Sequence, residues 1–273
     1  MASGLHGDNE KITNIMKVTI IGAGNIGGAV ARGLMAAKTI AQNDLTVVDL
    51  DESKLNELKS EYSSINTAKD GHDAASKSDV VILAVKPWLV EPVLSGIADV
   101  LTKDKIFACI AAGIDFAFLN KILKEPLAAF RVMPNTAMSI GESMTLISSQ
   151  NADAEQEKLI VDMFNDMGKA VLIPESMMGP ATSVASCGIA YALRYLHASA
   201  EGAVELGFRA DEAYQIVAQT MIGAAQLILK NHSHPEVEID KVCTPGGWTI
   251  KGLNEMEAYG FTDAVIKGIK KNK

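Results

Sequence analysis

The stretch Lys17-Val18-Thr19-Ile20-Ile21-Gly22-Ala23-Gly24-Asn25-Ile26-Gly27-Gly28 decides the fold. A short β-branched run leads into three spaced glycines, and a helical pattern over 26–37 follows them. Gly22 permits a tight turn, Gly24 lets a pyrophosphate approach the backbone, and Gly27 lets the helix pack against the strand. The N-terminus of the helix then faces the phosphates. The predicted dinucleotide-binding turn comprises Gly22, Gly24, Asn25, Ile26 and Gly27, and a tight turn without a ligand is the alternative.

Apolar runs alternate with helical patterns as far as residue 174. Strands are expected at 17–21, 45–48, 79–85, 106–111 and 127–133, with edge strands at 145–148 and 170–173. Continuous apolar strands separated by helices are typical of a parallel sheet covered on both faces. The sequence therefore predicts an α/β fold, a Rossmann-type doubly wound, mostly parallel sheet over residues 16–174.

From residue 175 onward the sequence is helical in pattern. Helices are expected over 181–206, 211–229, 249–259 and 262–271, without a strand. Their faces carry many small residues that one small domain cannot fully bury, so residues 175–273 are predicted to be an all-helical domain that holds a homodimer together. A compact monomer with tightly crossing helices is the alternative.

Composition limits the function classes. The chain has 273 residues and a net charge of −8, which argues against binding duplex nucleic acid. Its three cysteines contain no C-x-x-C pair, which favours free thiols in a reducing compartment. No apolar stretch is long enough to span a membrane, and residues 1–15 lack a signal-peptide pattern. We expect a flexible leader over 1–15 and a soluble, cytoplasmic protein.

Two aspartates follow the second strand. An acidic residue at the position of Asp49 accepts hydrogen bonds from the adenosine ribose of NAD. A 2′-phosphate placed here would meet both Asp49 and Asp51, and no arginine is near, so the sequence favours NADH over NADPH. Alternatively, Asp49 only starts a turn, and Asp51 or Ser53 caps the helix expected over 52–62.

Three further motifs show a family resemblance. They are Ala84-Val85-Lys86-Pro87, Arg131-Val132-Met133-Pro134-Asn135-Thr136, and Thr244-Pro245-Gly246-Gly247-Trp248-Thr249-Ile250-Lys251-Gly252-Leu253. Together with the glycine turn they resemble the pyrroline-5-carboxylate reductase family, over nearly all of residues 16–270. The last motif is the most specific, because a proline, two glycines and a threonine at that spacing occur in few other dehydrogenases.

The resemblance implies an NAD(P)H-dependent oxidoreductase that acts on a C=N bond. Hydride transfer to the cyclic imine 1-pyrroline-5-carboxylate gives L-proline, the last step of proline biosynthesis. Members of the family dimerise through their C-terminal helices and often assemble the dimers into larger rings. The resemblance adds Ala84, Val85, Lys86, Pro87, Ala112, Gly113 and Asn135 to the cofactor site, and it assigns Thr244, Gly246, Gly247, Trp248 and Thr249 to the substrate.

The chemistry of the last motif points the same way. Gly246 and Gly247 free the backbone to form an amide nest before a helix, which binds a carboxylate without a lysine or arginine. A glycine turn with a threonine cap and no ligand is the alternative. Reduction of a ketone would need a strong general acid, yet residues 186–194 contain no lysine. A protonated imine needs only orientation, so Thr249 is assigned as the orienting catalytic residue, with Tyr191 as the rival proton donor.

Some residues depart from the family pattern. Cys187-Gly188-Ile189 replaces serine-glycine-proline, and loss of the proline is expected to straighten that helix. Trp248 replaces a small residue and Ala137 a common proline. These changes keep open a reductase of another cyclic imine or hydroxyacid, and a dinucleotide-binding sensor or scaffold without turnover. His232 and His234 have no ligand partner at suitable spacing, so we expect no metal site.

Overall fold

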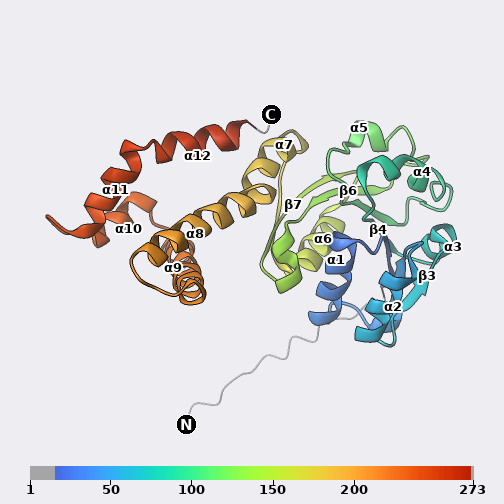
Figure 1. Cartoon of the computed structure of the whole chain (residues 1–273). Coiled ribbons are helices and arrows are strands. Elements are labelled where there is room, and N and C mark those ends of the chain that lie inside the picture. The colour runs from blue at the N-terminus through green and yellow to red at the C-terminus, as the bar shows by residue number, and fades with distance from the viewer. Residues whose placement is uncertain (1–15, 272–273) are drawn as a thin grey trace, which may run out of the picture. The chain divides into compact units, whose positions relative to one another are not determined.

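The computed structural model describes residues 16–271, so the predicted leader over 1–15 lies outside the described residues. The described chain divides into two compact units, the first ending at Ala181 and the second beginning at Thr182 (Figure 1). The division falls a few residues beyond position 174, after the short helix α7 (Met178–Ala181). Each unit is described separately below.

The first unit is built on one eight-stranded sheet. The strand order is β3-β2-β1-β4-β5-β6-β7-β8, and every neighbouring pair is parallel except β6 and β7. This order reverses direction beside β1, as in doubly wound sheets, which confirms the predicted fold class. The strands are β1 (Val18–Ile21), β2 (Leu45–Val48), β3 (Asn66–Ala68), β4 (Val80–Leu83), β5 (Ile106–Cys109), β6 (Ala128–Met133), β7 (Ser143–Gln150) and β8 (Gly168–Leu172).

Helices cover both faces of the sheet because every central strand is apolar on both sides (Figure 1). On one face Ile20 and Ile82 pack in a cluster with Leu34 of α1 (Asn25–Ala36) and Phe164 of α6 (Ala154–Asn165). The opposite face carries Val81, Leu83 and Phe107 against α4 (Val90–Ser95). The remaining helices of this unit are α2 (Glu52–Glu61), α3 (Gly71–Ser76) and α5 (Phe116–Leu119).

The second unit consists of helices throughout its described length. They are α8 (Gly188–Glu205), α9 (Ala210–Asn231), α10 (Pro235–Val242), α11 (Trp248–Ala258) and α12 (Phe261–Lys270). The helix expected over 181–206 is not continuous, because a π-helical turn at Thr182–Ser186 precedes α8. Ile189, which replaces the family's proline, lies in the first turn of α8, after the π-helical turn. The sequence analysis also missed α10 and, in the first unit, β3.

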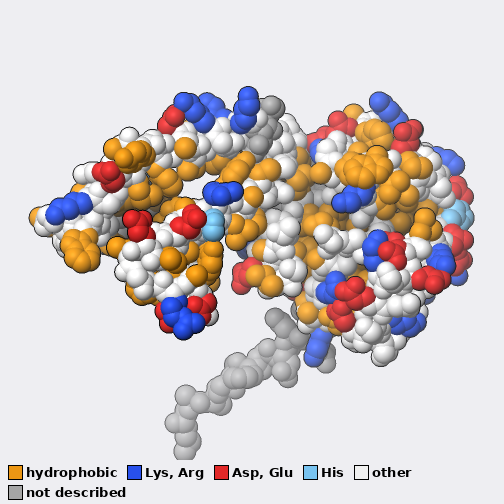
Figure 2. All heavy atoms as spheres, viewed as in Figure 1, with side chains coloured by type: hydrophobic (Ala, Val, Ile, Leu, Met, Phe, Trp, Pro, Cys, Tyr) orange, Lys and Arg blue, Asp and Glu red, His pale blue; other side chains and the backbone are white. Residues whose placement is uncertain are grey.

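The helical unit buries very little of its own surface. Within residues 182–271 the buried side chains are those of Ser183, Ala200 and Ala213. Leu206 is 84% exposed and Leu229 65% exposed, and Figure 2 shows hydrophobic side chains over the surface of these helices. An apolar surface of this extent indicates a binding partner. The described helices include none that is both long enough and apolar enough to cross a membrane.

Candidate active site

The turn between β1 and α1 holds three glycines with different physical roles. A Cβ on Gly22 would lie 2.5 Å from the carbonyl oxygen of Ala84, and one on Gly27 would lie 1.9 Å from the carbonyl oxygen of Gly22. Gly22 also has a φ of +109°, which a side chain would strain. At Gly24 a Cβ would meet nothing within 4 Å. The fold itself therefore requires Gly22 and Gly27, whereas the space beside Gly24 is open to a ligand.

Asp49 fastens this turn to the end of β2. Its Oδ2 accepts a hydrogen bond from the Ala23 amide at 2.7 Å, and its Oδ1 accepts one from the Asp51 amide at 2.9 Å. Asp51 caps α2 by accepting from the Ser53 amide and hydroxyl. The hydrogen bond from the Ser53 side chain lowers the pKa of Asp51, so this carboxyl stays ionised. The capping role foreseen for Asp51 is therefore present beside the predicted ribose position.

A cleft of about 390 Å³ opens above the turn, at the carboxyl ends of β1, β4 and β5. A ligand at this place meets the reversal point of the sheet, where doubly wound folds bind dinucleotides. The structure brings together most of the predicted cofactor residues here. The lining residues are Gly22, Gly24, Asn25, Ile26, Asp49, Lys54, Ala84, Val85, Lys86, Pro87, Leu89, Ile110, Ala111 and Ala112.

A second cleft of about 640 Å³ continues on the side of β2 and shares Gly22, Asp49, Val85 and Leu89 with the first. Apolar side chains such as Ile21, Val48 and Val93 line it, and Leu50 stands 84% exposed at its rim. An apolar slot next to an acidic strand end suits an adenine ring with its ribose at the carboxylate. The two clefts together therefore fit the two halves of a dinucleotide.

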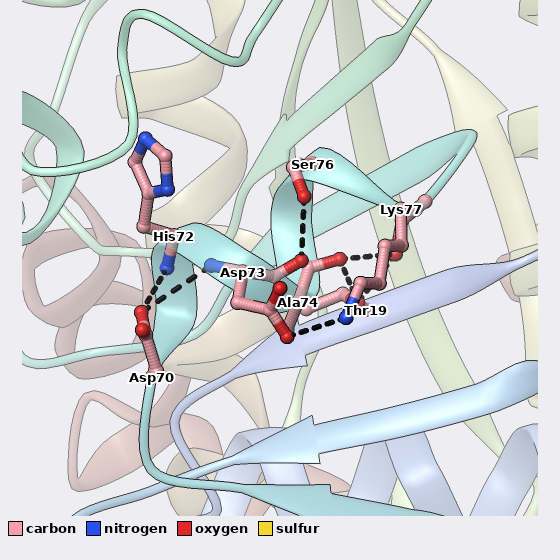
Figure 3. Close-up of polar contacts among 8 residues, drawn as sticks. Thr19, Asp70, His72, Asp73, Ala74, Ser76 and Lys77 are labelled. Carbon is pink, nitrogen blue, oxygen red and sulfur yellow. Dashed lines mark hydrogen bonds and ion pairs between the residues drawn. The ribbon is translucent and has the colours of Figure 1, made fainter.

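The start of α3 forms part of the wall of this second cleft, and Figure 3 shows the hydrogen bonds that hold this helix in place. Asp70 caps the helix by accepting from the amides of His72 and Asp73, at 2.9 and 3.3 Å. Between β1 and α3, the buried Thr19 hydroxyl lies 2.5 Å from the Ser78 hydroxyl and donates to the Ala74 carbonyl. These bonds fix α3 to β1, so Asp70, Gly71 and His72 keep their places along the cleft.

Three predicted cofactor residues do not line the first cleft. Gly27 packs under the turn, against the Gly22 carbonyl. Gly113 has a φ of +77° and lies exposed just beyond Ala112. Asn135 is buried, and its Oδ1 accepts from the Ala137 amide at 3.0 Å at the start of the 3₁₀ turn Thr136–Ile140.

The predicted substrate residues lie together at the start of α11. Gly246 is left-handed, with a φ of +72°, and the Gly247 amide donates to the Thr244 carbonyl at 2.9 Å. Gly247 is the N-cap and supplies no side chain to the first amides of α11. Thr249 is exposed, and Trp248 is 92% exposed. Amides at a helix start that have no side-chain cap are free to donate hydrogen bonds to a carboxylate.

Comparison with known proteins now bears on these two sites. Residues 175–273 match the family profile described as pyrroline-5-carboxylate reductase dimerisation, and residues 17–113 match the profile described as NADP oxidoreductase, coenzyme F420-dependent. Pyrroline-5-carboxylate reductase 2 of Dictyostelium discoideum is 36% identical over 273 residues, covering 94% of this chain and 91% of its own. The chain belongs to the pyrroline-5-carboxylate reductase family.

Two further relatives place the chain within this family. Pyrroline-5-carboxylate reductase 1 of the same organism is 37% identical over 264 residues, which are 92% of this chain, and the match spans only 48% of that relative. A crystal structure of Plasmodium falciparum pyrroline carboxylate reductase with NADP bound is similar with a TM-score of 0.85 and 25% identity, covering 94% of this chain and 95% of the other. Family membership and the two clefts together establish NAD(P)H as the cofactor class.

The sequence analysis missed two lysines beside the predicted ribose position. Lys54 Nζ lies 3.8 Å from Asp49 Oδ1 and 3.5 Å from Asp51 Oδ2, and it lines the first cleft. Lys69 lines the second cleft and pairs with Glu52 at 2.5 Å. Lys54 could have been found from the sequence, because it stands one turn into the helix that Asp51 caps. Lys69 directly follows β3, the strand that was not predicted from the sequence.

No group of His, Cys, Asp and Glu residues within 16–271 is arranged to hold a metal ion. His234 instead caps α10, accepting from the Glu236 amide at 3.2 Å, and His232 ends α9 in a left-handed conformation. All three cysteines are free; Cys109 is buried, whereas Cys187 and Cys243 are half-buried. Burial raises the pKa of Cys109 to about 11, so its thiol stays protonated.

Two glycine substitutions separate the structural and binding roles of the turn. In Gly24→Ala the new methyl enters open space, so the free energy of unfolding should change little, while the methyl occupies the path of the pyrophosphate. We expect the Kd for NADH to rise about tenfold or more, a loss of about 1.4 kcal/mol. Gly27→Ala should instead destabilise the protein strongly, because its methyl would overlap a backbone carbonyl. Thermal unfolding and NADH fluorescence titration measure both effects, and undiminished NADH affinity in Gly24→Ala would contradict this assignment.

Proposed function

We propose that this chain reduces 1-pyrroline-5-carboxylate to L-proline with NAD(P)H, the last step of proline biosynthesis. The observation that carries the proposal is membership in a family whose relatives bear this name over nearly the full length of the chain. The dinucleotide clefts and the glycine-rich start of α11 supply the two kinds of binding site that such a reaction needs.

The reaction places modest demands on the protein. The bound dinucleotide supplies a hydride, which adds to the imine carbon; the two electrons of the C=N π bond then remain on nitrogen as its lone pair. If the ring nitrogen is already protonated, the product is a neutral amine, so no strong acid is required. The protein must hold the two partners in line and exclude water. α8 contains no lysine that could act as the acid of a ketone reductase.

The start of α11 is the proposed substrate site. The amides of the first turn donate hydrogen bonds to the substrate carboxylate, and the helix dipole favours its negative charge. Thr244, Gly246 and Gly247 shape the turn, and the exposed Trp248 indole covers the bound ring. Thr249 orients the ring nitrogen or the carboxylate through its hydroxyl. Support comes from the left-handed Gly246 and the uncapped Gly247 described above.

The proposed cofactor site comprises the cofactor-binding residues predicted from the sequence, all of which lie in the first unit. Gly22, Gly24, Asn25, Ile26 and Gly27 hold the pyrophosphate, and Asp49 holds the ribose. The strand ends Ala84, Val85, Lys86, Pro87, Ala112 and Gly113 form the wall toward the nicotinamide, and Asn135 supports that end from beneath. Residues 16–174 thereby form the cofactor domain and residues 175–273 the substrate and dimerisation domain.

The chain forms dimers or larger oligomers, since its helical part matches a dimerisation domain. We propose that a second copy covers the apolar faces of α8 to α12 and that such dimers assemble further into rings. The scarcity of buried side chains in residues 182–271 supports the first step. A cytoplasmic location is also part of the proposal, supported by three free thiols.

NADH is the proposed preferred cofactor. The rim of the ribose position carries the carboxylates of Asp49, Asp51, Glu52 and Asp70 against the amines of Lys54 and Lys69. Each lysine is already paired with a carboxylate, and the carboxylates outnumber the amines, so the rim has an excess of negative charge. A neutral 2′-hydroxyl suits such a rim better than a 2′-phosphate does.

The direct test of the function is steady-state oxidation of NADH and NADPH with 1-pyrroline-5-carboxylate, a six-membered cyclic imine and a keto acid. We expect turnover with the five-membered imine to exceed the others at least tenfold in kcat/KM. Tight dinucleotide binding without oxidation by any imine would instead indicate a sensor or scaffold protein.

Thr249→Ala tests the orienting group. We expect kcat/KM for the imine to fall by roughly 10²-fold, the usual range for loss of a positioning contact, while the Kd for NADH stays unchanged. Thr262→Ala is a matched control, because this threonine lies on α12 and pairs with Glu257. Normal turnover by Thr249→Ala would remove this residue from the site.

Asp51→Asn tests the cofactor preference. Asparagine retains an oxygen to cap α2 while removing one charge from the rim. The ratio of kcat/KM for NADPH to that for NADH should rise roughly threefold or more, because a 2′-phosphate then meets less repulsion. Lys54→Ala should move the same ratio in the opposite direction. An unchanged ratio in both variants would show that this rim does not select the cofactor.

A further inference from the structure

One carboxylate in the first unit joins three separate elements. Glu175 begins the 3₁₀ turn Glu175–Met177, which follows β8. Its Oε1 accepts a hydrogen bond from Arg131 Nη1 of β6 at 2.8 Å and another from the Phe116 amide of α5, also at 2.8 Å. A single carboxylate oxygen thus bridges the Arg131 side chain and the Phe116 amide, where the loop that leaves β5 enters α5.

The arginine in this bridge is largely buried. Only 11% of the Arg131 side chain is exposed. In the sheet, Arg131 lies opposite Cys109 of β5 on one side and opposite Ser148 of β7 on the other. A protonated thiol and a hydroxyl cannot neutralise a guanidinium, and burial keeps the Cys109 thiol protonated. Glu175 therefore supplies the opposite charge to Arg131, and the pair fixes the position of the carboxylate.

The loop held by this carboxylate borders the cofactor cleft. It leaves β5 at Ile110, whose amide donates to the Leu83 carbonyl at 2.9 Å, and it ends at Phe116 on Glu175. Ala111 and Ala112 line the cleft between these two anchors. Gly113 follows with a φ of +77°, so the loop turns sharply between its two fixed ends.

We propose that Glu175 is a positioning residue for hydride transfer, acting through the Phe116 amide on the wall formed by Ala111 and Ala112. The inference rests on the proposed function, because that wall borders the nicotinamide end of the cofactor site. The glycine turn and Asp49 hold the other end of the dinucleotide and do not contact Glu175. Loss of Glu175 should therefore disturb the alignment of the reacting carbon more than the affinity for the dinucleotide.

Glu175→Ala is the principal variant. Since a displacement of about 1 Å can cost about 10²-fold in rate, we expect kcat to fall at least tenfold. The Kd for NADH should change less than threefold. If Glu175 were needed only for stability, its removal would lower the melting temperature and the folded fraction, but each folded site would retain its kcat. NADH titration counts those sites, so kcat is expressed per site.

Two further variants act as controls. Glu175→Gln removes the charge opposite Arg131 but keeps an oxygen that accepts from the Phe116 amide. The loop is held through that amide hydrogen bond, so kcat should return to within about threefold of the wild-type value. Glu61→Ala removes a carboxylate that pairs with another arginine, Arg32 at 2.7 Å, and Glu61 lines neither cleft. It should leave kcat and the Kd for NADH unchanged.

Amide hydrogen exchange gives a second measurement that does not need turnover. The peptide containing Phe116 should exchange faster in Glu175→Ala and at the wild-type rate in Glu61→Ala. Wild-type exchange in Glu175→Ala, or an unchanged kcat per site, would overturn the assignment of Glu175. An inactive wild-type protein would refute the proposed reaction, and the exchange result would still decide whether Glu175 holds the loop.

Discussion

The close approach of α1 to β1 is the constraint on which the first unit depends. Any side chain on Gly27 would run into the Gly22 carbonyl, and any side chain on Gly22 would run into Ala84 of the adjoining strand end. Because these three backbones touch, α1 starts close to the ends of β1 and β4, and Asn25 and Ile26 of its first turn line the cleft. Asp49 then secures the turn from β2 through the Ala23 amide. The cleft, its polarity and the path of the loops around it all follow from this contact.

The second unit obeys a different physical rule. Its helices carry leucines, valines and aromatic residues, yet hardly any of these side chains become buried within residues 182–271. Burial of apolar surface is the main favourable term in folding, so this unit must obtain much of its stability from another molecule. α11 belongs to this unit, so the position of its uncapped first amides depends on the same assembly.

The sequence predicted the doubly wound sheet because its signals are local and strong. Apolar runs identified five strands, and the two edge strands expected at 145–148 and 170–173 correspond to β7 and β8, of which only β8 lies at an edge of the sheet. The spacing of Gly22, Gly24 and Gly27 identified the turn. β3 was not predicted because Asn66–Ala68 is short and polar. Its strand conformation depends on its parallel pairing with β2 and not on the β-propensity of its own residues. The charge of Lys69 escaped for a related reason, because its pairing with Glu52 joins two segments that are separated along the chain. Lys54 lies one turn into α2, so its place beside Asp51 could have been predicted.

The exposed apolar helices also affect how the protein is made in a cell. In a newly synthesised chain the sheet unit has a buried core of its own, whereas most apolar side chains of residues 182–271 stay uncovered until another copy binds. Maturation is then a second-order process, so its speed depends on how fast copies accumulate. At low expression the half-covered monomer persists longer, and proteases and chaperones have more time to act on it. Steady-state abundance should consequently rise more steeply than the rate of synthesis.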